Sequence, residues 1–373
     1  MDHRHIQTFL RMIIIHFCIC IIIICRWFPK MTVAKERYLV IGGGGFLGKT
    51  IADMLADRGD DVTVFDLRFA KETDARVKYI VGDITRLADV ELACASKSVV
   101  IHTASPIHGK ASAVYFKVNV EGTSNVIAAC STARVQKLIY TSSAGVIYNG
   151  QDLLNANEST PYCKVHMDAY NESKAIAELA VLKANDPEGL LTCALRPSGI
   201  FGPRDSQGSL SIVEASKRGQ WRMMIGDNTN LFDMTYVDNA AYAHVLAADK
   251  LSHSNGIGGE AFTITNDQPV FFWDFPMALY HGLGYKQTQK MKIPTNVGYL
   301  IGALMDTFAY LLSPFWAIHP SLSVFRVKVI SANRYFDISK AKDVLGYRPI
   351  VSYGEAIDRT VEYWKSQGYG NQQ

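Results

Sequence analysis

The feature that most constrains the fold is a short apolar run, 38–41, that leads into a glycine-rich turn at 42–48. Glycines stand at 42, 45 and 48, and residues 49–58 can continue as a helix. In such a turn one glycine supplies positive φ, the next lets the backbone approach a pyrophosphate, and the last lets helix and strand pack closely. The N-terminal amides of the helix would face that pyrophosphate. The pattern predicts a dinucleotide-binding turn through Gly42, Gly45 and Gly48.

The residues that follow support this interpretation, since three glycines alone could serve any tight turn. A second apolar strand, 62–65, comes directly after the helix and ends on Asp66. An acidic residue about 20 positions after the first glycine accepts hydrogen bonds from the ribose diol and repels a 2′-phosphate. We therefore expect NAD and not NADP. Arg68 could in principle meet a phosphate, but a solvated surface side chain is the simpler interpretation.

Strands and helices alternate through the first two hundred residues. Further apolar strands are expected at 78–81, 99–101, 138–140 and 190–195, and helices at 114–130 and around Lys174. Nearly continuous apolar strands indicate a parallel sheet covered on both faces, with ligands beyond the carboxyl ends of the strands. This predicts an α/β, Rossmann-type doubly wound fold.

We expect three parts along the chain. Residues 1–35 form an apolar extension, and residues 36–200 form the NAD-binding core, to which 230–265 return. Residues 201–373 form a smaller, mostly C-terminal substrate-binding lobe. The 373 residues are 48% hydrophobic and carry a net charge of +3. No basic run with interleaved aromatic residues occurs, so no nucleic-acid partner is expected, and the seven cysteines form no Cys-x-x-Cys pair that would suggest a metal site.

Tyr170 and Lys174 are the strongest catalytic candidates. Four residues apart on a helix, they lie on one face. A free tyrosine has a pKa near 10. A nearby ammonium and an oxidised nicotinamide both favour the phenolate and so lower that pKa. Tyr170 could then take the proton of a substrate hydroxyl while hydride leaves the same carbon, and Lys174 could hold the nicotinamide ribose.

Ser142 and Ser143 follow the strand at 138–140. At the carboxyl end of a sheet strand, either hydroxyl could bond the reacting oxygen and stabilise developing charge. Three candidates are weaker. His102 is more simply a packed or loop residue, His166 could contact the substrate, and Asn119 could be structural or a relay.

Together these motifs resemble the extended short-chain dehydrogenase/reductase superfamily over about residues 36–365. The resemblance rests on Gly-x-x-Gly-x-x-Gly at 42–48, Gly-Asp-Ile at 82–84, Thr-Ser-Ser at 141–143, Tyr-x-x-x-Lys at 170–174 and Leu-Arg-Pro-Ser-Gly-Ile-Phe-Gly-Pro at 195–203. The Thr-Tyr-Val-Asp-Asn stretch at 235–239 is similar to the 3β-hydroxysteroid dehydrogenase family. The segments 271–275, 335–341 and 345–347 look like its sterol-4α-carboxylate 3-dehydrogenase (decarboxylating) subgroup.

The resemblance implies an NAD-dependent oxidation of the 3β-hydroxyl of a C4-carboxylated sterol. It favours Ser143 over Ser142 as the catalytic serine. It also implies further cofactor contacts, from Phe46, Leu47, Asp83, Ile84, Thr103, Ala104 and Pro197. Oxidation at C3 would create a ketone β to the carboxylate, and loss of CO2 would leave an enolate that Tyr170 and Ser143 could stabilise. No separate decarboxylase motif is needed.

Two apolar stretches bear on membranes. Residues 12–25 could be a signal anchor or interfacial anchor, a leader that is absent from a protein starting at Met31, or a secretion signal. Residues 297–318 are long enough to span a bilayer, but we favour a helix that lines the sterol pocket or lies on the membrane surface, with a buried core helix as the alternative. The resemblance implies an endoplasmic reticulum membrane location, with the catalytic domain on the cytosolic side, and partners among other sterol C4-demethylation enzymes.

Other functions remain open at this point. The chain could be a 3β-hydroxysteroid or triterpenoid tailoring dehydrogenase that does not decarboxylate. It could also be a non-catalytic NAD-binding protein, although Tyr170 and Lys174 are both present. Nucleotide-sugar epimerases share the motifs, but the apolar C-terminal part argues against a hydrophilic substrate.

Overall fold

The computed structural model describes residues 36–68, 73–285, 291–312 and 322–370. Residues Arg37–Gln373 cluster as one compact unit. The apolar extension 1–35 lies outside the described residues, as do 313–318 of the second apolar stretch.

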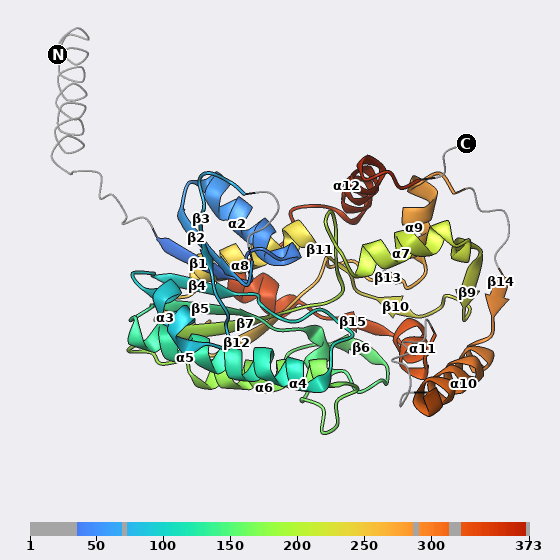
Figure 1. The fold of residues 1–373 in the computed structure, drawn as a ribbon, viewed down its shortest axis with the longest axis horizontal. Helices are drawn as coiled ribbons and strands as arrows, with labels where there is room; N and C mark the ends of the chain where they lie inside the picture. The colour runs from blue at the N-terminus through green and yellow to red at the C-terminus, as the bar shows by residue number, and fades with distance from the viewer. Residues whose placement is uncertain (1–35, 69–72, 286–290, 313–321, 371–373) are drawn as a thin grey trace, which may run out of the picture. The chain divides into compact units, whose positions relative to one another are not determined.

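A seven-stranded parallel sheet forms the centre of this unit (Figure 1). Its order is β12-β7-β5-β4-β1-β2-β3, in which the chain reverses direction along the sheet after β3. Burial of Leu39, Val40 and Ile41 on both faces of β1 explains why this strand is apolar throughout. The strands are β1 (Arg37–Ile41), β2 (Asp61–Asp66), β3 (Lys78–Val81), β4 (Val99–His102), β5 (Lys137–Thr141), β7 (Leu191–Pro197) and β12 (Glu260–Ile264).

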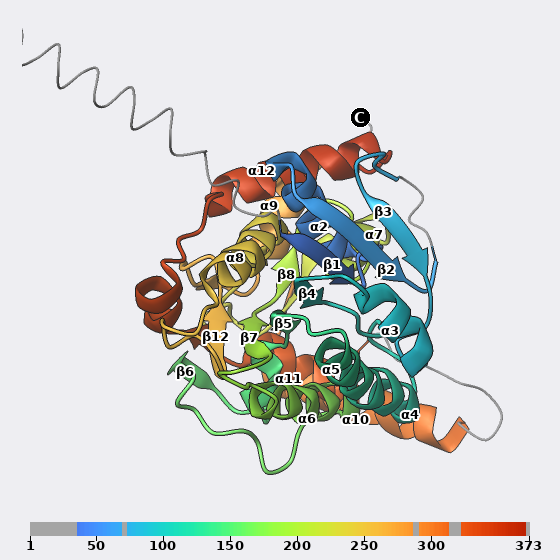
Figure 2. The same ribbon diagram turned by 90° about the vertical axis from the view of Figure 1, so that its left-hand side faces the viewer.

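Helices cover both faces of the sheet, as the doubly wound prediction requires. Figure 2 shows α2 and α8 over one face and α3, α5 and α6 over the other. The bounds are α2 (Phe46–Arg58), α8 (Val237–Lys250), α3 (Leu87–Cys94), α5 (Gly122–Thr132) and α6 (Ala169–Lys183). Helix α8 and strand β12 lie within the segment expected to return to the core, and β12 pairs with β7.

The helix expected over 114–130 is not one regular helix. It consists of α4 (Ser112–Tyr115), a π-helical turn η1 (Phe116–Glu121) and α5. Asn119 lies in the π-helical turn, where it is buried and donates to Ser173 Oγ on α6 at 2.9 Å. The widened turn thus ties this helix to the one that carries Tyr170.

A smaller four-stranded sheet lies beyond the carboxyl ends of the central strands, in the order β13-β10-β15-β6. Its strands are β6 (Leu153–Ala156), β10 (Leu231–Phe232), β13 (Val270–Phe271) and β15 (Arg334–Phe336). Two strand pairs accompany it: β8 (Ile200–Phe201) with β11 (Thr235–Tyr236), and β9 (Met223–Ile225) with β14 (Met291–Ile293). The remaining segments are η2 (Ala144–Ile147), α7 (Gly208–Lys217), η3 (Gln220–Arg222), α9 (Asp274–Gly282), α10 (Thr295–Leu312), α11 (Val324–Ser331), η4 (Ala341–Leu345) and α12 (Tyr353–Ser366).

Helix α10 corresponds to the second apolar stretch. It packs on α11, and a side chain at Gly302 would lie 2.9 Å from the Ser323 carbonyl carbon, so the two backbones approach closely there. Apart from Gly298 and Gly302 its residues are not buried, so it is not the core helix that we considered as an alternative. None of the helices in the described part of the chain has both the length and the apolar character needed to cross a bilayer.

Candidate active site

The glycine turn joins β1 to α2 with no room for side chains. Gly42 has a φ of +81°, and a Cβ there would lie 2.6 Å from the Ala104 amide nitrogen. A Cβ at Gly48 would lie 2.2 Å from the Gly42 carbonyl oxygen. Gly45 caps α2 without a side-chain hydrogen bond, so the first turn of the helix keeps its amide donors available. The turn therefore has the bare backbone that a pyrophosphate site needs.

Asp66 ends β2 directly beside this turn. Its Oδ2 accepts a hydrogen bond from the Gly44 amide at 3.0 Å, and its Oδ1 accepts one from the Leu67 amide at 2.7 Å. Asp83 makes a local loop cap by accepting from the Thr85 amide and hydroxyl, and Ile84 is buried near Gly122. The acid expected to bind ribose thus lies next to the turn expected to bind phosphate.

A cavity of about 850 Å³ extends from this turn across the ends of β4, β5 and β7. The residues expected at the reaction centre all line it: Ser142, Ser143, Tyr170 and Lys174. So do four of the residues expected to contact the cofactor: Phe46, Leu47, Thr103 and Pro197.

Tyr170 and Lys174 lie in the first two turns of α6, which begins after Asp168. The Asp168 carboxylate accepts from the Asn171 amide at 2.7 Å and so fixes the start of the helix. Ser143 caps η2 by accepting from the Gly145 amide at 3.0 Å, and its side chain lowers the pKa of Tyr170. The Ser142 hydroxyl is buried and has no partner among the described residues. Ser143 is therefore the serine next to Tyr170.

Burial controls the charge states of the pair. It raises the pKa of Tyr170 to about 12, helped by the Asp168 carboxylate and opposed by the Ser143 hydrogen bond. It lowers the pKa of Lys174 to about 7, opposed by Glu178. We expected Lys174 to lower the pKa of Tyr170, but the lysine is not among the groups that shift it.

Lys174 points at the end of β5. Its Nζ donates to the Thr141 carbonyl oxygen and lies 4.2 Å from the centre of the Tyr140 ring. These contacts hold the ammonium at the strand end.

Two aromatic residues that the sequence did not single out pack on Tyr170. The His108 ring lies 4.4 Å from the Tyr170 ring between centroids, and the Tyr115 ring lies 5.7 Å away with its edge toward it. His108 belongs to the loop after β4, and its backbone amide donates to Gln207 Oε1 at 2.8 Å. The Tyr170 ring thus packs against aromatic rings from two separate segments.

Arg334 is the most unusual residue of the cavity. Its guanidinium carbon lies 4.6 Å from the Tyr148 ring centre and 4.5 Å from that of Phe232. Its Nε is buried without a partner, and Nη2 makes only a long, 3.5 Å bond to the Val329 carbonyl. Burial lowers its pKa to about 10. No carboxylate in the described part of the chain forms an ion pair with it, so a cation faces the cavity without a counter-charge.

The far wall of the cavity is apolar. It is built from the smaller sheet, α11 and the segment before β6 by Tyr148, Leu153, Phe232, Phe325, Val329 and Phe336. This wall suits a flat hydrocarbon body better than a sugar.

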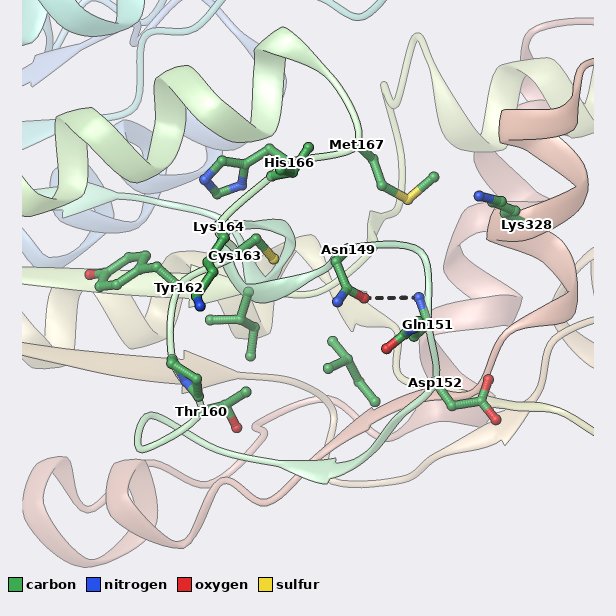
Figure 3. A pocket seen from close by; sticks show the side chains of 14 residues that line it. Asn149, Gln151, Asp152, Thr160, Tyr162, Cys163, Lys164, His166, Met167 and Lys328 are labelled. Atoms are coloured by element: carbon green, nitrogen blue, oxygen red, sulfur yellow. Dashed lines mark hydrogen bonds between the residues drawn. The ribbon is translucent and has the colours of Figure 1, made fainter.

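A second cavity, of about 730 Å³, has Ile147 and Asn149 in its lining (Figure 3). It is enclosed by residues 147–153 and the loop 160–167, and Lys328 extends from α11 toward Met167 at one side. His166 lines this second cavity and not the one that holds Tyr170. His102 is buried, hydrogen-bonded to Thr123, and packs beside Tyr140. Among the described residues, no three His, Cys, Asp or Glu side chains gather as a metal site.

Comparison with known proteins agrees with this geometry. Residues 39–295 match the model of the 3-beta hydroxysteroid dehydrogenase/isomerase family. The chain belongs to this family. Within the family, it is 44% identical over 337 residues to sterol-4-alpha-carboxylate 3-dehydrogenase erg26, decarboxylating, of Schizosaccharomyces pombe, a match that covers 88% of this chain and 98% of that protein. It is 41% identical over 329 residues to the mouse sterol-4-alpha-carboxylate 3-dehydrogenase, decarboxylating, with 88% of this chain and 90% of that protein covered.

Solved structures confirm the Rossmann-type fold expected of a family member. The structure of gox2253 matches with a TM-score of 0.74 at 23% identity, over 90% of this chain and all of that one. The Thermus thermophilus UDP-glucose 4-epimerase in complex with NAD matches with a TM-score of 0.67 at 23% identity, over 88% of this chain and 99% of that one.

Proposed function

We propose that this protein oxidises the 3β-hydroxyl of a C4-carboxylated sterol with NAD and releases the C4 carboxylate as CO2. One observation carries the proposal: Tyr170, Ser143 and Lys174 share a cavity with an unpaired arginine and an apolar wall. Relatives with more than 40% identity over most of the chain are named as decarboxylating sterol-4-carboxylate 3-dehydrogenases, which supports the same substrate class.

The residues around the glycine turn fit NAD. The space at Gly42 and Gly48 admits no Cβ, so the backbone there can contact a pyrophosphate, and Asp66 is placed to accept from a ribose diol. When bound, NAD would accept the hydride from C3. Lys174 lies four residues after Tyr170 on α6 and lines the same cavity, so it could hold the nicotinamide ribose.

Tyr170 and Ser143 would act on the C3 oxygen. Because burial keeps Tyr170 protonated, its hydroxyl needs a route for its proton before it can accept one from the substrate. Ser143 lines the same cavity and lowers the pKa of Tyr170, so its hydroxyl could pass a proton or hold the substrate oxygen in place. The same two donors would then stabilise the enolate oxygen after CO2 has left.

Arg334 would bind the substrate carboxylate. A guanidinium presents paired donors that match a carboxylate, and a partly desolvated cation gains most from such a partner. A substrate without a carboxylate would leave Arg334 unpaired in an apolar wall. This is why we favour the decarboxylating reaction over a plain hydroxysteroid or triterpenoid dehydrogenase, which stays as the alternative.

The test follows NADH and CO2 together, with purified full-length protein in detergent, NAD and a 3β-hydroxysterol-4-carboxylate. We expect equal amounts of both products, and Tyr170→Phe should abolish both. NADH without CO2 would move the assignment to the plain dehydrogenase, and neither product would reject both.

We further propose that α10 lies on a lipid bilayer surface. Leu300, Leu304, Phe308 and Leu311 recur at helical spacing and are all more than half exposed. The single charged residue of α10, Asp306, accepts from the Val324 amide and so leaves this face uncharged. Helix α11 packs on α10 and also carries Phe325 and Val329 of the cavity wall. A sterol would therefore leave the bilayer one helix away from the reaction site.

This arrangement is tested by tryptophan quenching with brominated phosphatidylcholine vesicles. Phe308→Trp in the full-length protein should add a fluorophore that the bromines quench. Leu92→Trp is the matched control, since Leu92 is 70% exposed on α3. Equal quenching at both positions, or none at 308, would reject surface insertion by α10.

We also propose that the protein lies at the endoplasmic reticulum membrane, with its catalytic part on the cytosolic side. We propose further that it contacts other sterol C4-demethylation enzymes. Both proposals rest on the family resemblance. Protease treatment of sealed microsomes should degrade the catalytic part, and full protection would contradict this topology. Co-purification from gently solubilised microsomes should retain a C4-methyl oxidase, and recovery of this chain alone would contradict the association.

A further inference from the structure

Loss of CO2 leaves a proton-transfer step that the residues named so far do not complete. This inference rests on the proposed function. After decarboxylation the electron pair of the C4–carboxylate bond becomes the C3=C4 double bond of an enolate. Tyr170 can protonate the oxygen to give the enol, but the ketone forms only when C4 itself receives a proton. Tyr170 and Ser143 hold the oxygen, so a different group has to face C4.

We propose that His108 is the acid that delivers the proton to C4. Its ring lies 4.4 Å from the Tyr170 ring between centroids. A substrate whose C3 oxygen meets the Tyr170 hydroxyl would therefore bring C4, the adjacent carbon, close to the imidazole. It lines the same cavity, and it is held over Tyr170 from both ends of its loop. Its amide donates to Gln207 Oε1, and the Tyr115 hydroxyl donates to the Ile107 carbonyl at 3.0 Å.

Several other titratable groups of the cavity are held by hydrogen bonds. The Asp168 and Asp205 carboxylates accept hydrogen bonds from backbone amides at the starts of α6 and α7. The Lys174 ammonium donates a hydrogen bond to the Thr141 carbonyl oxygen. The Tyr115 hydroxyl, on α4, accepts from the Lys110 amide and donates to the Ile107 carbonyl oxygen. The His108 imidazole makes no hydrogen bond to any described residue, so both of its nitrogens are available.

Exposure also suits His108 to this task. A donor that gives up a proton in every turnover has to regain one from water. His108 lies at the exposed rim of the cavity, whereas Lys174 is 2% exposed. Although part of the residue is exposed, the surroundings of its ring lower the pKa of His108, and the Asp168 carboxylate opposes this by favouring the protonated imidazole.

The step balances without any further reactant. Imidazolium Nε2–H or Nδ1–H gives its proton to C4, the C3=C4 pair forms the new C–H bond, and the enol O–H proton returns to the Tyr170 phenolate. Imidazole then recovers a proton from water. A positioned general acid speeds such a transfer by about 10²–10⁴-fold, so C4 should be protonated from one face only.

The experiment uses a sterol that carries both a methyl and a carboxylate on C4, with full-length protein and NAD in D2O. Wild type should give a 3-ketone with one deuteron at C4 and a single configuration there. His108→Phe keeps an aromatic ring against Tyr170 but cannot donate a proton. It should form NADH and CO2 in equal amounts, while the fraction of the minor C4 epimer rises roughly tenfold or more, because water then protonates the enol without a positioned acid.

His253→Phe is the matched control, since His253 is exposed and does not line the cavity. A single epimer from His108→Phe with both products intact would overturn the role of His108 alone. If His108 merely positions Tyr170, His108→Ala would lower NADH formation without changing the epimer ratio, and this too would overturn the inference. NADH without CO2 from wild type would overturn the proposed function and the inference together.

Discussion

Replacing Arg334 by methionine tests how the site selects a carboxylate. Methionine keeps an unbranched stem between Tyr148 and Phe232 but removes the charge and all donors. Hydrogen bonds to charged groups contribute about 1.5–3 kcal/mol each. Loss of a paired contact with the substrate carboxylate should therefore cost about 3 kcal/mol, or roughly a hundredfold in kcat/KM.

The same substitution should leave folding nearly unchanged. Arg334 has no ion pair in the described part of the chain, and burial disfavours its charge by lowering its pKa. Removing it sacrifices two ring contacts of about 0.5–2 kcal/mol each and relieves a desolvation cost of similar size. We expect the free energy of unfolding to change by less than about 1 kcal/mol, a near-cancellation of these terms.

The assay measures kcat/KM for NADH formation on a 3β-hydroxysterol with and without the 4-carboxylate. In Arg334→Met, kcat/KM should fall only for the carboxylated substrate. Arg359→Met is the control, since Arg359 is exposed on α12, where it pairs with Asp238 and Glu355. Equal losses on both substrates, or no loss on the carboxylated one, would refute the carboxylate-binding role of Arg334.

Three further predictions concern the cofactor site and the fold. Gly48→Ala should unfold more easily, by about 1–3 kcal/mol in chemical denaturation, because its Cβ would lie 2.2 Å from the Gly42 carbonyl oxygen; wild-type stability would contradict the close approach. Asp66→Ser should raise the KM for NAD roughly tenfold and improve use of NADP, because the acceptor of the ribose diol is removed; an unchanged NAD/NADP preference in initial rates would speak against the assignment. Asp233 is fully buried, and burial raises its pKa to about 7, above its value in the unfolded chain. The folded state therefore binds the extra proton, so this group's contribution to stability is complete below about pH 4 and is lost as pH rises through 7. Asp233→Asn should accordingly raise the melting temperature more at pH 8 than at pH 5, and an equal shift at both pH values would contradict the burial argument.

The central sheet and the glycine turn could be predicted because their signals are local. The eleven residues 38–48 contain the strand, the turn and the start of the helix in one continuous pattern. Tyr170 and Lys174 lie four residues apart on one face of a single helix. Such patterns depend on neighbours in the sequence, which periodicity reports directly.

Arg334 and His108 could not be found in that way. Arg334 lies on β15, which pairs with both β6 and β10, strands that lie far apart in the chain. In this arrangement the rings of Tyr148 and Phe232 both contact the Arg334 guanidinium. His108 lies in an irregular loop whose path is set by Tyr115 and Gln207. Nothing in the neighbouring sequence predicts such contacts. The π-helical turn at Phe116–Glu121 was not predicted either, because its apolar pattern is the same as that of an ordinary α-helix.

The dependence of CO2 release on NAD tests the central claim most directly. If one site oxidises C3 and thereby makes the carboxylate unstable, the purified protein should release no CO2 from the 3β-hydroxysterol-4-carboxylate until NAD is added, and then one CO2 for each NADH. Supplying the 3-keto acid instead should release CO2 without NADH formation. Release of CO2 from the hydroxy acid at the same rate without NAD would contradict the account.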